Sequence, residues 1–149
     1  MDRLLPLLIV PLIAACVTPL PPGAPEFAQR AAPPEGQNEI ELLAGFNGRL
    51  AIRDNCLGAV SVYPEADTFV TIIWPSSARL VRDGNSWRVN NTANGESIRV
   101  GERISGGGGY AGKHDRETLK LYNRFLTRKL SIACAQFGTF SLNRDFQRQ

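Results

Sequence analysis

The chain is poor in the residues that catalysis and metal binding use most often. Its 149 residues include one histidine and three cysteines, and no group of His, Cys and Asp residues has the spacing of metal ligands. The cysteines form no Cys-x-x-Cys motif, which excludes a dithiol redox site of that kind. A single histidine needs a positioned nucleophile or metal ligands before it can catalyse a reaction. We therefore expect a protein that is not an enzyme and that uses no metal and no cofactor.

Long apolar runs and a large charge excess are also missing. The apolar run at residues 4–15 is shorter than the ~20 residues of a membrane-spanning helix, and Pro6 and Pro11 interrupt it. The net charge of +3 is too small to indicate nucleic-acid binding, although it suits an anionic envelope surface. With 43% hydrophobic and 21% charged residues the composition is that of a globular protein, and the length predicts one domain.

The apolar run ends in a cleavage signal. Two small residues, Ala14 and Ala15, fit a signal-peptide cleavage site, and Cys16 follows them directly. The segment LIAAC at residues 12–16 resembles the lipobox of bacterial lipoproteins. In that family the cysteine thiol receives a diacylglycerol group, the peptide is cut before it, and the new amino terminus is acylated. The resemblance implies a signal peptide at residues 1–15 and lipidation of Cys16; the alternative is an ordinary signal peptide with a cysteine near its cut.

A lipid on Cys16 would place the protein in the cell envelope with a periplasmic domain. Acyl chains contribute ~0.8 kcal/mol per buried methylene, so several chains together make a stable membrane anchor. Val17 follows the cysteine, whereas an aspartate at that position retains many enterobacterial lipoproteins at the inner membrane. The resemblance therefore favours the outer membrane over the inner one.

Lipidation of Cys16 would leave Cys56 and Cys134 as the remaining cysteines. In an oxidising compartment two such cysteines form a disulfide by default. The alternative is that one of them is a reactive thiol.

A proline-rich segment separates the candidate anchor from the rest of the chain. Residues 16–38 contain six of the ten prolines: Pro19, Pro21, Pro22, Pro25, Pro33 and Pro34. Proline fixes φ and removes a backbone donor, so this segment is expected to be an extended linker without regular structure. It would hold a domain at residues 39–149 off the lipid surface.

Within residues 39–149, short β-branched or alternating segments are separated by turn sequences such as Asp83-Gly84-Asn85 and Asn94-Gly95. They predict strands at 48–53, 57–63, 68–74, 79–82, 86–89, 96–100 and 137–142. Residues 115–129 are expected to form a helix, since acidic residues lie in its first turn and basic residues in its last. Many short strands at regular spacing favour a mainly β fold, a small OB-like or SH3-like barrel with one C-terminal helix before the last strand.

Five short segments support this fold by resemblance: GRLAIRDNC, IIWPSSARL, VRDGNSWRV, RVGERISGGGGY and CAQFGTFSLN. Together they resemble small β-barrel domains of uncharacterised bacterial lipoproteins and secreted proteins, over about residues 46–142. The resemblance implies an OB-like barrel, and it carries no established activity and no functional residues.

The glycine-rich segment at 106–109 is expected to be a loop before the helix. Residues 107–113 match the GxxxxGK spacing of a phosphate-binding loop, but His114 stands where such loops carry Ser or Thr. The surrounding strands also indicate an antiparallel meander rather than a βαβ unit. The alternative is a turn that needs the backbone freedom of glycine. His114, beside Asp115, is either a general base or a surface residue at the start of the helix.

Four basic residues recur at intervals of four along the expected helix: Arg116, Lys120, Arg124 and Arg128. Like charges at this spacing cost a few tenths of a kcal/mol each. They would form a stripe that contacts an anionic partner, such as lipid headgroups, lipopolysaccharide phosphates or an acidic protein. The alternative is a solvated outer face.

These observations favour a cell-envelope lipoprotein whose domain is a structural or binding module tethered by its N-terminal lipid. Its expected partners are the membrane, through the anchor, and an anionic envelope component or protein, with no nucleic acid. The alternative is a small envelope hydrolase or transferase that uses the glycine-rich segment and His114.

Overall fold

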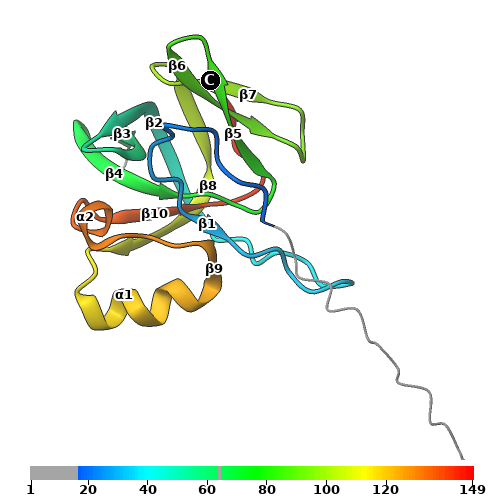
Figure 1. Cartoon of the computed structure of the whole chain (residues 1–149), viewed down its shortest axis with the longest axis vertical. Helices are drawn as coiled ribbons and strands as arrows, with labels where there is room; N and C mark the ends of the chain where they lie inside the picture. The colour runs from blue at the N-terminus through cyan, green and yellow to red at the C-terminus, as the bar shows by residue number, and fades with distance from the viewer. Residues whose placement is uncertain (1–16, 64) are drawn as a thin grey trace, which may run out of the picture.

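The computed structural model describes residues 17–63 and 65–149 (Figure 1). The candidate signal peptide and Cys16 lie outside these residues. The strands are β1 (Gln29–Arg30), β2 (Ala44–Arg53), β3 (Cys56–Tyr63), β4 (Thr68–Ile73), β5 (Ala78–Asp83), β6 (Ser86–Asn91), β7 (Ser97–Arg99), β8 (Arg103–Gly112), β9 (Leu126–Arg128), β10 (Thr139–Leu142) and β11 (Gln147–Arg148). The helices are α1 (Arg116–Tyr122), the 3₁₀ turn η1 (Asn123–Phe125) and α2 (Ile132–Ala135).

Five strands close into a barrel. They pair in the order β10-β4-β3-β2-β8, and β8 pairs again with β10 to close the ring. All of these pairs are antiparallel except β4 with β10, which run parallel. A closed five-stranded barrel with this non-sequential order is of the OB type. The expected fold class, mainly β with a short helix before the final strands, is confirmed.

The side chains of every second strand residue point inward and fill the barrel interior. In β2 the burial alternates from Phe46 through Gly48 to Leu50, and the neighbours Asn47 and Arg49 are less buried. The ring of Phe46 packs on that of Phe140 from β10, with centroids 4.7 Å apart. Burying such side chains, at ~1.5–3 kcal/mol each, is the main stabilising term of the fold.

A three-stranded sheet, β5-β6-β7, covers one end of the barrel (Figure 1). Its inward residues Leu80, Trp87 and Ile98 belong to the same core cluster as the barrel interior. This sheet lies at the opposite end of the molecule from α1 (Figure 1).

A second core lies outside the barrel, against β3 and β4. Phe69 and Ile73 from β4 pack there with Leu119 of α1, Leu130 and Cys134. Cys134, in α2, forms a disulfide with Cys56 at the start of β3, as the cysteine count predicts. The disulfide and α2 therefore cover the outer face of β3 and β4, which are the second and third strands of the barrel in chain order. In OB folds that face is the usual oligonucleotide-binding surface.

The expectation of a structureless linker over 16–38 is wrong, because Leu20 and Ala24 already pack against the main core. Phe27 and Ala28 are buried, and the ring of Phe27 stacks on Trp74 with centroids 5.5 Å apart. The backbone N–H of Trp74 donates to Ala28, and β1 pairs with β9. The physical reason is that residues 26–32 contain no proline, so their backbone keeps every donor that strand pairing needs.

The glycine-rich segment is not a loop. Gly106 to Gly109 lie in the middle of β8, paired with β2 on one side and with β10 on the other. The chain approaches Phe140 so closely that a side chain at Gly108 would have no room. Glycine is required here by packing and not by a turn.

The expected helix at 115–129 is too long. The helix begins as predicted, because the Asp115 carboxylate accepts a hydrogen bond from the backbone N–H of Thr118 at 2.8 Å. It ends at Tyr122, because the side-chain amide of Asn123 forms two hydrogen bonds with the backbone of Leu130 and so turns the chain. Its Nδ2 donates to the Leu130 carbonyl, and its Oδ1 accepts from the Leu130 N–H. Residues 126–128 then form β9. Across the described residues, no helix is long and apolar enough to cross a membrane.

Candidate functional site

The backbone of the glycine-rich segment is committed to the barrel. The registers place Gly106, Gly107 and Gly108 opposite β2, and Gly108 and Gly109 opposite β10. A phosphate-binding loop needs free backbone N–H groups, whereas a strand with a partner on each side uses them in its ladders. The segment therefore has no phosphate-binding geometry despite its GxxxxGK spacing.

His114 is held between two neighbours. Its Nε2 lies 3.1 Å from the Thr139 hydroxyl, and its ring stacks on Tyr122 with centroids 4.8 Å apart. Thr139 is fully buried, so a substrate has no access to its hydroxyl. Asp115 caps α1, and its hydrogen bonds with Thr118 lower the pKa of its carboxyl group. Neither Thr139 nor Asp115 therefore offers His114 an accessible nucleophile.

The four basic residues do not share one face. Arg116 and Lys120 are exposed on α1, and Arg124 is exposed on η1. Arg128 belongs to β9 and is half-buried in a pocket. The stripe is broken because the helix ends before its third member.

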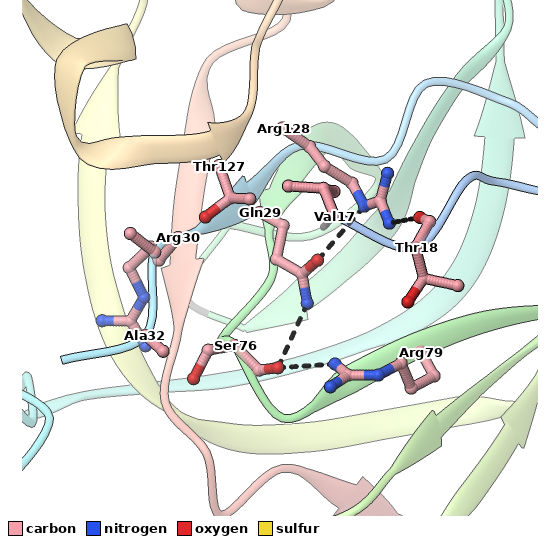
Figure 2. Close-up of a pocket in the computed structure, with 10 residues that line it drawn as sticks. Val17, Thr18, Gln29, Arg30, Ala32, Ser76, Arg79, Thr127 and Arg128 are labelled. Atoms are coloured by element: carbon pink, nitrogen blue, oxygen red, sulfur yellow. Dashed lines mark hydrogen bonds between the residues drawn. The ribbon is translucent and has the colours of Figure 1, made fainter. Parts of the chain in front are cut away.

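The pocket that contains Arg128 has a volume of about 430 Å³ and is drawn in Figure 2. It lies between β1, β9, the start of β5 and the residues that follow Cys16. Its lining consists of Val17, Thr18, Gln29, Arg30, Ala31, Ala32, Ser76, Arg79, Thr127 and Arg128.

Gln29 is the buried centre of this pocket. Its Nε2 donates to the carbonyl oxygens of Pro75 at 3.0 Å and Ala78 at 2.8 Å. Its Oε1 accepts a hydrogen bond from Nε of Arg128 at 3.2 Å. Figure 2 shows the Gln29 amide between the two arginines Arg79 and Arg128. Gln29 therefore joins β1 to the start of β5 and orients Arg128.

Both arginines are positioned by neutral oxygen atoms. Nη1 of Arg79 donates to the carbonyls of Ser76 at 2.6 Å and Ala78 at 2.8 Å. Nη2 of Arg128 donates to the carbonyl of Thr18. Among the residues that the structure describes, neither arginine pairs with a carboxylate. Burial lowers the pKa of Arg128, and the nearby charge of Arg79 lowers it further.

Sequence reasoning included Arg128 among the anion contacts but missed Arg79 and Gln29. The three residues come from β9, β5 and β1, so no local spacing connects them. Each is an ordinary polar residue within its own segment.

A second, apolar cavity of about 350 Å³ adjoins this pocket, and Arg30 lines both. Ile40, Leu42, Tyr110 and Phe125 contribute to its walls. Phe125 is 72% exposed and Ile40 77% exposed. This side of the molecule thus presents both positive charge and apolar side chains to its surroundings.

Comparison of the chain with protein-family models, with curated proteins and with solved structures finds no match. Within the described residues, no three His, Cys, Asp or Glu side chains gather to hold a metal ion.

Replacing Gln29 with methionine should lower the free energy of unfolding by about 2 kcal/mol. Methionine has a similar shape but cannot donate, so the buried carbonyl of Pro75 loses its side-chain partner. Chemical denaturation would measure the loss. Gln37→Met, at an exposed site, is the matched control and should leave the midpoint unchanged. Equal midpoints for the two variants would contradict the role assigned to Gln29.

Proposed function

We propose that the protein is a cell-envelope lipoprotein, anchored through Cys16, whose barrel is a binding module held against the membrane surface. The observation that carries this proposal is that the chain contacts the folded domain within a few residues of Cys16. Thr18, two residues after Cys16, accepts a hydrogen bond from Arg128, and Leu20 already packs against the main core.

This packing changes the role expected of the proline-rich segment. Two extended residues span about 7 Å, so a lipid on Cys16 would hold the Arg128 side of the barrel close to the headgroups. The segment then orients the domain on the membrane instead of spacing it away. The exposed Ile40 and Phe125 on the adjoining surface suit the interfacial region of a bilayer.

Two further features support an envelope binding module. The Cys56–Cys134 disulfide is typical of an oxidising compartment such as the periplasm. The second core covers the barrel face that oligonucleotides use in OB folds, which favours a partner other than nucleic acid.

The anchor is tested by Cys16→Ala in cells fed a radiolabelled fatty acid. The wild type should carry the label and sediment with membranes, because its acyl chains bury many methylenes. Cys16→Ala should carry no label and should leave the sedimented membranes after a high-salt wash.

Thr18→Ala is the control for this experiment, since it retains the backbone carbonyl that Arg128 contacts. Its label and sedimentation should equal those of the wild type. Density-gradient separation of the two membranes should place the protein with the outer one. An unlabelled wild type that is free in the periplasm would contradict the proposal.

A further inference from the structure

The Arg79–Arg128 pocket carries positive charge that nothing in the described chain neutralises. Its third arginine, Arg30, pairs with Glu39 at 3.0 Å. No acidic residue lines the pocket, and neither of the other two arginines has a carboxylate partner among residues 17–63 and 65–149. Two like charges side by side are unfavourable without a counter-ion. A bound anion would remove this cost.

The donors available to an anion can be counted. A guanidinium has five N–H donors, and Arg79 and Arg128 each use two of them on neighbouring oxygens. Each side chain therefore keeps three N–H donors, six in total, that make no hydrogen bond with the described residues. A carboxylate offers about four lone-pair sites, whereas a phosphate monoester has three strong acceptor oxygens with more sites. Arginine forks also match phosphate geometry in bidentate contacts.

The site is prepared before any ligand binds. The Nε of Arg128 donates a hydrogen bond to Oε1 of Gln29, which fixes Arg128, and two backbone carbonyls fix Arg79. The hydroxyl-bearing residues Thr18, Ser76 and Thr127 line the same pocket, as Figure 2 shows. A ligand therefore meets oriented donors and does not have to order two free arginine side chains.

We propose that the Arg79–Arg128 pocket binds a phosphate monoester, supplied by the phosphorylated headgroup of an envelope lipid. The lipid source rests on the proposed function, because it is the anchor that would hold Thr18 at the headgroup level. The binding of a phosphate group itself needs only the two arginines.

The test uses the full chain with Cys16→Ala, so that no anchor contributes to membrane binding. Inorganic phosphate is titrated at constant ionic strength while the arginine Nε–H resonances are followed by NMR. Separately, the protein is sedimented with phosphatidylcholine vesicles that contain phosphatidic acid, a monoester, or phosphatidylglycerol, a diester. Saturable shifts of Arg79 and Arg128 are expected. Binding to the phosphatidic acid vesicles should be the strongest.

Arg79→Gln and Arg128→Gln should each weaken both kinds of binding by about tenfold, equivalent to about 1.4 kcal/mol. Arg116→Gln removes the same charge from exposed α1 and should change the affinity for phosphate by less than about twofold, since it loses no hydrogen bond to the ligand. Arg79 is exposed, so its variant keeps the test valid even if Arg128→Gln fails to fold. Arg79→Lys, which keeps the charge without the fork, should bind at an intermediate level.

Saturable phosphate binding without vesicle binding would support the phosphate site and overturn the lipid source. Binding that is absent for both probes, or that Arg116→Gln weakens as much as Arg79→Gln, would overturn the proposal. Because the Cys16→Ala chain has no anchor, none of these outcomes depends on lipidation. Failure of the fatty-acid labelling of the wild type remains a separate result.

Discussion

Replacing Gly108 with alanine is expected to lower the free energy of unfolding by about 3 kcal/mol, at the upper end of the usual cost of overpacking. A Cβ at this position would lie 2.3 Å from the backbone oxygen of Ser141 and 2.2 Å from a ring carbon of Phe140. The Ser141 oxygen belongs to the paired strand β10 and cannot rotate away. The β8–β10 pair that closes the barrel must therefore separate. Thermal unfolding should show a melting temperature lower by about 10 °C.

Gly109→Ala is the matched control for Gly108→Ala, one residue along the same strand. Its added Cβ would meet Cδ1 of Leu42 at 2.6 Å, the far end of a flexible side chain that can change rotamer. The expected loss is about 1 kcal/mol or less. Equal, small losses at both positions would mean that Gly108 is not packed inside a barrel. A large loss at Gly108 alone would exclude a flexible phosphate-binding loop.

The error over the glycine-rich segment has a physical origin. Strand prediction depends on side chains that alternate between buried and exposed, and four consecutive glycines have no side chains to alternate. The other barrel strands carry the signal clearly, so the ranges expected at 57–63 and 68–74 agree closely with β3 and β4. What requires glycine in β8 is the ring of Phe140, more than thirty residues later. Only the closed barrel brings the two segments together.

The end of the helix and the pocket could not be predicted, for a related reason. Residues 123–129 have ordinary helix-forming composition, and it is the side-chain contacts of Asn123 with Leu130 and the pairing of β9 with β1 that end the helix. The same pairing carries Arg128 to Gln29. The start of the helix was predictable because its signal, acidic residues in the first turn, lies within a few residues of the chain. Contacts over about a hundred residues leave no local pattern.

The cysteine pair is the long-range feature that sequence reasoning did predict, and its removal should be the most damaging change in the described chain. The disulfide joins residues separated by 78 positions. In the chain-entropy model, opening a loop of that length costs about 4.5 kcal/mol of stability. This is a large part of the 5–15 kcal/mol that stabilises a typical domain. Cys56→Ala with Cys134→Ala should therefore leave much of the protein unfolded near 37 °C.

The location of the disulfide sharpens this expectation. Both cysteines are buried in the second core, and the backbone oxygen of Cys134 accepts a hydrogen bond from the Thr71 hydroxyl at 2.8 Å. Loss of the covalent link would free α2 from β3 and expose Phe69 and Ile73 on the outer face of the barrel. Hydrogen exchange should then accelerate first in α2 and β3, before it does so in the β5-β6-β7 sheet.

Reduction of the wild-type protein gives an independent measurement, since it opens the disulfide without changing the sequence. Reductant should lower the stability of the wild type to that of the double alanine variant and should leave the double variant unchanged. The oxidised wild type should also be lighter than the reduced form by two hydrogens, and free thiols at both positions in exported protein would contradict the disulfide. If the double variant unfolds with the stability of the wild type, the second core alone holds α2 on the barrel. The disulfide would then be dispensable for the fold.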